Sequence, residues 1–291
     1  MNLEQLLEAL ASEQDLYGVL DEAFLPLDRE HIRRSNNIRL IPHKRFRQGG
    51  KHSYAEWAHV VGIFQTLLFL HLKGSEDNRV LDIGCGWGLM GIAAEPFIGA
   101  HGQYTGIDVE PSAIAFCRSH YPSGLFEFIE FDVSNALYAP DRVGEQAAWP
   151  VPADSYDMVT ALSVWTHFHE RDALFYLQEV ARVLKPGGKA VISAFLLDDA
   201  YQQSVASRNS RPGRFHRLPQ DRWVFDQTME GSGNWYYPAW VDVPEQAIAI
   251  NEQGLAQLLE SANLRVLESH QGNWKEVPGL FFQDVLVLQK P

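Results

Sequence analysis

The chain has 291 residues, of which 46% are hydrophobic, so it can bury a large core in one α/β domain with an appended cap. Its formal net charge of −13 argues against general binding to DNA and gives no electrostatic reason to lie on an anionic membrane. Its two cysteines exclude a disulfide framework and a cysteine-based metal site. The start lacks the features of a signal peptide, and the longest apolar stretch, near residues 60–72, is too short to span a bilayer. We therefore expect a cytoplasmic protein without membrane insertion and without a bound metal.

Composition divides the chain into four segments. Residues 1–53 form an N-terminal extension, which begins with an amphipathic helix over residues 3–20 and continues as a basic segment. Residues 54–197 form the core, and residues 251–291 complete it. Between them, residues 198–250 break the regular pattern with many aromatic residues. We expect this insert to be ordered and to act as a cap, because its aromatic density argues against disorder.

Strands and helices alternate through the core. The expected strands are residues 80–83, 104–108, 126–131, 156–162, 190–196, 265–268 and 281–288. The expected helices are residues 54–73, 90–98, 112–120, 171–184 and 252–262, with Ser112 as the N-cap of the third and Pro186-Gly187-Gly188 ending the fourth. This pattern predicts a Rossmann-like α/β fold with a mostly parallel, seven-stranded sheet and helices on both faces.

Two basic runs stand out in this acidic chain, residues 29–51 and residues 208–222. One interpretation is a solvated surface, which is usual for such runs. The other is that they hold an anionic group of a substrate, such as a phosphate or a carboxylate. The sequence leaves both open.

A glycine-rich turn follows the first expected strand, as Gly84-Cys85-Gly86-Trp87-Gly88. Glycines at alternate positions allow a sharp turn and a close approach to a ligand, and Asp82 at the strand tip adds a counter-charge for a cationic group. The residues from Gly86 to Gly91 also satisfy the G-x-G-x-x-G pattern of dinucleotide-binding proteins. There, however, the first glycine follows the strand directly, and here the strand ends at Ile83, which favours the register that starts at Gly84.

A second carboxylate, Asp108, ends the strand over residues 104–108. A carboxylate at this point of a βαβ unit can accept hydrogen bonds from both hydroxyls of a ribose. Enzymes that bind NAD use the same device. Asp108 therefore indicates an adenosine cofactor without naming it.

Together with three later segments, these motifs resemble the class I S-adenosylmethionine (SAM) dependent methyltransferases. The later segments are residues 128–133, 156–163 and 179–188, and the resemblance covers residues 54–197 well and 251–290 in outline. It implies SAM as the cofactor, with the ribose on Asp108. The other cofactor residues that it implies are, for the methionine end, Asp82, Gly84, Cys85, Gly86, Gly88, Ala161, Leu162 and Ser163, for the adenine, Asp132, and, without an assigned part of SAM, Val109, Val133 and, as a weaker candidate, Tyr54.

Residues 163–168 and, upstream, residues 45–50 resemble methyltransferases of glycan and sugar biosynthesis. No Asn/Asp-Pro-Pro-Tyr motif follows the fourth strand, which argues against methylation of amines on nucleic-acid bases. No carboxylate pair occurs where the catechol-type enzymes of this class bind magnesium.

His167 and His169 are the catalytic candidates, because an alcohol acceptor has a pKa far above 7 and benefits from a base. His167 is the first choice, and a packing role for it is equally open. Three aromatic residues, Trp165, Tyr236 and Tyr237, are candidates for binding the acceptor beneath the cap, although aromatic clusters more often form core.

The sequence thus predicts transfer of a methyl group from SAM to a hydroxyl of a small molecule, such as a sugar, a glycan precursor or a natural product. Three alternatives remain open: N-methylation of a small molecule, a protein or RNA; an NAD-dependent oxidoreductase; and an inactive SAM-binding partner subunit. The sequence leaves the oligomeric state open as well, a homodimer included.

Overall fold

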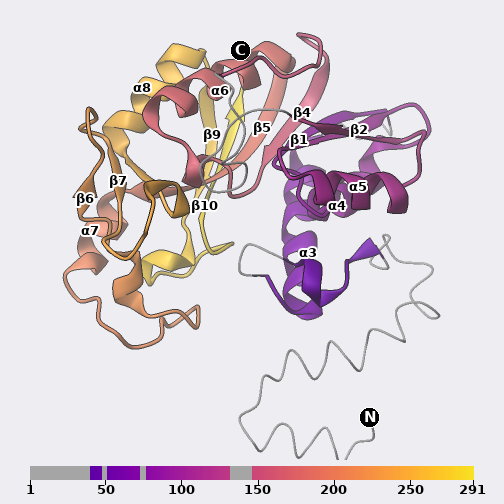
Figure 1. Ribbon diagram of the computed structural model, residues 1–291. Coiled ribbons are helices and arrows are strands. Elements are labelled where there is room, and N and C mark those ends of the chain that lie inside the picture. The colour runs from indigo at the N-terminus through magenta and orange to yellow at the C-terminus, as the bar shows by residue number, and fades with distance from the viewer. Residues whose placement is uncertain (1–39, 48–50, 73–76, 132–145) are drawn as a thin grey trace, which may run out of the picture.

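The computed structural model describes residues 40–47, 51–72, 77–131 and 146–291 (Figure 1). The helix expected over residues 3–20, most of the basic run 29–51, and the predicted cofactor residues Asp132 and Val133 lie outside the described residues.

A single mixed sheet of ten strands runs through the described residues, in the order β3-β2-β1-β4-β5-β8-β7-β6, and β10 pairs with β5 and β9. The strands are β1 (Arg79–Ile83), β2 (Gln103–Asp108), β3 (Phe126–Glu130), β4 (Tyr156–Ala161), β5 (Leu184–Leu197), β6 (Gln227–Thr228), β7 (Trp235–Tyr237), β8 (Ala249–Asn251), β9 (Arg265–His270) and β10 (Asp284–Gln289). Neighbours among β1 to β5 are parallel, whereas β10 is antiparallel to both β5 and β9. The Rossmann-like fold class predicted from the sequence is confirmed. The seven expected strands are all present, and the insert adds three short ones.

Helices cover both faces of this sheet (Figure 1). They are α3 (Tyr54–His71), α4 (Leu89–Ile98), α5 (Pro111–His120), α6 (Glu170–Val183), α7 (Asp199–Val205) and α8 (Glu252–Ala262). The helices α3, α4 and α5 pack their buried residues on one face, and α6 and α8 pack on the other. Among the described residues, no helix is long and apolar enough to cross a membrane.

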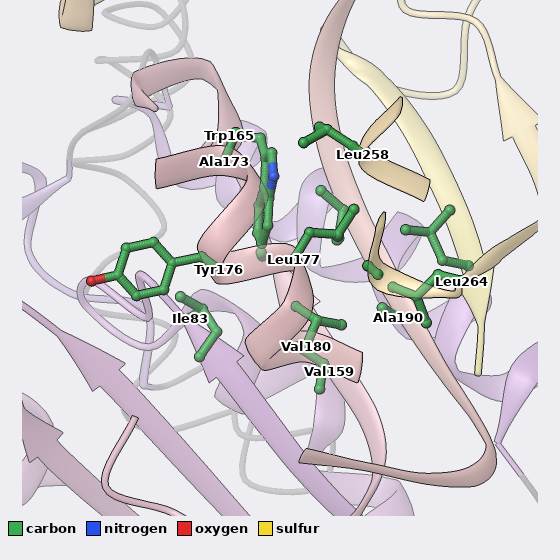
Figure 2. Close-up of a cluster of buried hydrophobic side chains, with 14 of the residues drawn as sticks. Ile83, Val159, Trp165, Ala173, Tyr176, Leu177, Val180, Ala190, Leu258 and Leu264 are labelled. Carbon is green, nitrogen blue, oxygen red and sulfur yellow. The ribbon is translucent and has the colours of Figure 1, made fainter. Parts of the chain in front are cut away.

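The core on the α6 face shows how the sequence pattern becomes packing. Leu177 and Val180, one helical turn apart, are 2% and 0% exposed and face the sheet (Figure 2). Val159 of β4 and Leu258 of α8 belong to the same cluster. Because each fully buried aliphatic side chain contributes about 1.5–3 kcal/mol, this layer fixes α6 on the sheet. The N-terminal end of α6 is thereby held beside the carboxyl end of β4.

Two boundaries differ from the expectation. Pro111 is the first residue of α5, and Glu110 is its N-cap, with a carboxylate that accepts a hydrogen bond from Ser112 N at 3.1 Å. Proline is favoured at this first position because its missing N–H would have no partner there. The segment Pro186-Gly187-Gly188 does not form a loop after α6 but belongs to β5, where the pairing with β4 shifts register.

The insert carries its own small core. Trp223 and Phe225 pack there with Phe195 of β5 and with Trp274, which follows β9. The C-terminal end of β5 also pairs with β8 of the insert. The strands of the insert therefore extend the sheet beside that end of β5.

A buried ionic network fixes the start of the insert. Lys275 Nζ lies 2.7 Å from Asp198 Oδ2 and 2.7 Å from Asp284 Oδ1, and its side chain is 0% exposed. Asp198 also caps α7, whose first residues begin the insert. The network therefore ties the insert to β10 of the core.

Candidate functional site

The glycine turn after β1 adopts a conformation that requires glycine. Gly84, Gly86 and Gly88 have φ angles of +67°, +48° and +88°. Side chains rarely tolerate this left-handed region. A Cβ at Gly84 would also lie 2.6 Å from Val164 Cγ2, and one at Gly88 would collide with the Tyr121 side chain. At Gly86, in contrast, no atom lies within 4 Å of such a Cβ, so this backbone is open to a ligand.

Asp82 lies beneath the glycine turn and is 1% exposed. Its Oδ2 accepts a hydrogen bond from Tyr104 Oη at 2.6 Å, and its Oδ1 accepts one from Thr160 Oγ1 at 2.7 Å. Burial raises the pKa of Asp82 to about 7, while these two hydrogen bonds act in the opposite direction. The carboxylate thus links β1 to β2 and β4 as well as contributing to the site.

Asp108, at the end of β2, fixes the shape of the turn. Its Oδ2 accepts a hydrogen bond from Gly86 N at 2.6 Å, and its Oδ1 accepts one from Glu110 N at 2.9 Å. Burial raises the pKa of Asp108, and the hydrogen bonds from the backbone oppose that rise. Each carboxylate oxygen has a second lone pair. Asp108 can therefore hold the turn and still accept hydrogen bonds from a ligand.

These groups line a cavity of about 610 Å³ at the carboxyl ends of β1, β2 and β4. The predicted site residues that line it are Asp82, Gly84, Cys85, Gly86, Asp108, Val109, Leu162, Ser163, His167 and His169. Lining residues that the sequence did not single out include Lys51, Trp57, Glu110, Trp149, Arg171, Tyr176 and Glu245. Among the described residues, no group of three or more histidine, cysteine or acidic side chains could hold a metal ion.

His167 ends the short 3-10 turn η3 (Trp165–His167) between β4 and α6. Its Nδ1 lies 2.6 Å from the main-chain oxygen of Glu245. A carbonyl oxygen only accepts, so Nδ1 carries the proton and Nε2 of the neutral ring carries the lone pair. Burial lowers the pKa of His167 and keeps the ring neutral near pH 7. A neutral histidine with a fixed tautomer is suited to accept a proton.

The insert reaches the cavity through Glu245, in the 3-10 turn η5 (Pro244–Gln246). While its main-chain oxygen bonds His167, its Oε1 lies 2.8 Å from Nε2 of His169. His169 is the N-cap of α6, at the rim of the cavity. Glu245 thus joins both candidate histidines. No sequence signal marked this glutamate within the insert.

The predicted acceptor-binding aromatics lie elsewhere in the structure. Trp165 packs in the core on the α6 face, 8% exposed, because the η3 turn directs it toward Ala173 (Figure 2). Tyr236 donates from its hydroxyl to the carbonyl of Gly233, and Tyr237 packs against the core on the α6 face. Neither tyrosine is among the cavity-lining residues, because the pairing of β7 with β8 places both on the sheet extension.

Three predicted cofactor residues are not among those that line the cavity. Gly88 is the N-cap of α4, and Ala161 is a buried residue at the end of β4. Tyr54 begins α3 and packs against the core on the face of α3, α4 and α5.

A parallel α/β sheet with a glycine turn after the first strand and a carboxylate after the second is typical of enzymes that bind an adenosine cofactor at the strand ends. A family model described as a methyltransferase domain matches residues 54–269, and the chain belongs to this family. This confirms the predicted SAM-dependent methyltransferase class and SAM as its cofactor, and it sets aside the NAD-dependent oxidoreductase.

The chain is similar to curated members of this class. It is 34% identical over 115 residues to the ubiquinone biosynthesis O-methyltransferase of Xanthomonas oryzae pv. oryzae, a match that spans 40% of the chain and 42% of that enzyme. It is 24% identical over 231 residues to the 27-O-demethylrifamycin SV methyltransferase of Amycolatopsis mediterranei, covering 74% and 78% of the two chains. The match to the ubiquinone biosynthesis enzyme therefore covers less than half the length of that enzyme.

Among solved structures, the PH0226 protein of Pyrococcus horikoshii aligns with a TM-score of 0.51 at 16% identity, covering 81% of this chain and 91% of that one. At this identity the similarity concerns the fold. The residues present also fit SAM. The backbone at Gly86 is open to a ligand, and the Asp108 carboxylate adjoins it.

Proposed function

We propose that this protein transfers the methyl group of SAM to a hydroxyl group of a small molecule, such as a sugar, a glycan precursor or a natural product. The observation that carries the proposal is the placement of His167, with its tautomer set by the Glu245 carbonyl, on the same cavity as the glycine turn. Two relatives whose names specify an oxygen acceptor support the choice of a hydroxyl.

The proposed cofactor contacts follow from the cavity. Asp108 accepts from the ribose hydroxyls while it holds Gly86, and the backbone of the glycine turn borders the methionine end together with Leu162 and Ser163. Asp132, the proposed adenine contact, and Val133 lie outside the described residues. Bound SAM supplies a methyl group already activated by its sulfonium. The protein must therefore chiefly align this group with the acceptor oxygen.

His167 supplies the remaining requirement, a group that takes the hydroxyl proton. In this proposal Nε2 accepts the proton, and the main-chain oxygen of Glu245 stabilises the resulting imidazolium through the Nδ1–H bond. Burial lowers the pKa of His167, so the ring does not hold a competing proton at neutral pH. Three aromatic side chains of the cavity wall stack on one another, Trp149 and Phe168 each on Tyr176.

The test begins with calorimetric titration of SAM, S-adenosylhomocysteine and NADH, followed by turnover on a panel of hydroxylated acceptors. His167→Gln should lower turnover by about a hundredfold or more while the affinity for S-adenosylhomocysteine stays unchanged. Glu245→Gln is the matched control, because it keeps the main-chain oxygen that bonds His167 while it removes the carboxylate that contacts His169. Full turnover in His167→Gln would remove the proposed base. Binding of NADH alone would overturn the proposed function.

A further inference from the structure

Lys51 is a cation of the cavity wall that the sequence placed only within a basic run. It is half-buried and lies three residues before α3. Its carbonyl oxygen accepts a hydrogen bond from Trp57 Nε1 at 3.0 Å. The Glu56 carboxylate accepts hydrogen bonds from the backbone N–H groups of His52 and Ser53, both at 3.0 Å. The backbone next to Lys51 is therefore tied to the first turn of α3.

The strand order shows on which side of the cavity Lys51 lies. In the sheet, β1 with its glycine turn lies between β2, which ends at Asp108, and β4, which precedes Ser163. Lys51 Nζ lies 6.0 Å from the ring centroid of Phe281. Two residues further on, Gln283 accepts a hydrogen bond from Ser163 Oγ at 3.0 Å. Lys51 therefore lies on the β4 side of the glycine turn, and Asp108 lies on the β2 side.

This separation matches the two ends of SAM under the proposed function, on which the inference rests. A ribose on Asp108 leaves the amino-acid end of the cofactor to extend across β1 toward β4. That end carries one ammonium and one carboxylate. Asp108 and Glu110 supply negative charge around the glycine turn, whereas Lys51 supplies positive charge beyond it.

We propose that the Lys51 ammonium binds the methionine carboxylate of SAM and so selects nucleosides that carry an amino acid. Burial in the cavity wall lowers the pKa of Lys51 to about 8, and the Glu56 carboxylate opposes this shift. A carboxylate bound beside the ammonium favours its charged form and recovers part of the cost of that burial. The other arginine or lysine of the described lining, Arg171, lies in the first turn of α6 beside His169.

The experiment compares two ligands that differ only in the carboxylate. They are S-adenosylhomocysteine and 5′-(3-aminopropylthio)-5′-deoxyadenosine, which keeps the ammonium. Calorimetry should show that Lys51→Met weakens binding of S-adenosylhomocysteine about 10- to 100-fold and leaves the affinity for the aminopropyl compound unchanged. Lys51→Arg should restore most of the loss. Arg171→Met, the matched control, should change neither affinity.

Equal losses for both ligands in Lys51→Met, or no loss for either, would overturn the role of Lys51. An unchanged affinity for S-adenosylhomocysteine combined with a raised KM for the acceptor would also overturn it, and would place the lysine at the acceptor. If the unaltered protein bound neither ligand, the proposed function itself would fail. Calorimetry thus distinguishes a failure of the Lys51 role from a failure of the proposed function.

Discussion

Replacing Asp108 by asparagine should weaken cofactor binding although the two side chains have the same shape. The two carboxylate oxygens accept from two different backbone groups, Gly86 N and Glu110 N. An asparagine has one acceptor oxygen, and its NH2 group must face the other N–H. The variant therefore loses one of the two internal hydrogen bonds, and it also loses the negative charge offered to the ribose.

The expected magnitude follows from the loss of a hydrogen bond to a charged group. Such a bond contributes about 1.5–3 kcal/mol, which corresponds to about a 10- to 150-fold change in affinity. The N–H left without a partner should also lower the free energy of unfolding by about 1–3 kcal/mol. We therefore expect Asp108→Asn to bind S-adenosylhomocysteine at least tenfold more weakly and to unfold at a lower temperature even without ligand.

Calorimetric titration with S-adenosylhomocysteine and thermal unfolding with and without ligand measure both effects. Asp172→Asn is the control, because Asp172 also lines the cavity but accepts its hydrogen bond from the side chain of Gln146, at 2.7 Å. That variant should keep its cofactor affinity. If Asp108→Asn bound the ligand as tightly as the unaltered protein and unfolded at the same temperature, the double role of this carboxylate would be refuted.

Three further predictions concern stability. Lys275→Met should lower the free energy of unfolding by about 3–5 kcal/mol, since the buried carboxylate of Asp284 and the partly buried carboxylate of Asp198 lose their cation. A loss under about 1 kcal/mol in denaturant titration would contradict this. Gly88→Ala should destabilise the fold and weaken SAM binding, because φ is +88° there. Gly62→Ala, within α3 and with nothing near its Cβ, should instead raise the free energy of unfolding by about 1 kcal/mol. Equal melting temperatures for the two variants would contradict this prediction. The pKa of Asp82 in the folded state, about 7, lies above its ordinary 3.8, so the folded state holds this proton more tightly. The contribution of protonated Asp82 to the free energy of unfolding is complete below about pH 4 and is lost as the pH rises to about 7. Urea titrations across this range should show that decline in the unaltered protein but not in Asp82→Asn.

The sequence was sufficient for those parts of the site that depend on one strand and the turn after it. The glycine turn and Asp108 follow strands β1 and β2 directly, and parallel strands bring their carboxyl ends to one edge of the sheet. Their position at a common cavity could therefore be predicted. The bond between Asp82 and Thr160 also follows from the register, since these two residues are direct partners in the pairing of β1 with β4.

The rest depends on how distant segments meet, which no local pattern records. Glu245 reaches His167 only because β8 extends the sheet beside β5 and brings the preceding turn η5 to the cavity. The role of the aromatic residues of the insert could not be predicted either, because their composition fits two different environments. Their composition indicates burial equally well beneath the insert and around a ligand, and the structure buries Trp223 and Trp235 in the core. Lys51 resembled any other member of a basic surface run.

The bond that orients His167 comes from a main-chain oxygen, and this has an evolutionary consequence. No change of side chain at position 245 removes that oxygen. A change that removes the Glu245 carboxylate, in contrast, removes the hydrogen-bond partner of His169 at the rim. The rim can therefore vary during the divergence of related enzymes while the tautomer of the inner histidine is inherited intact. Only an insertion, a deletion or a proline that displaces the whole η5 turn would disconnect it.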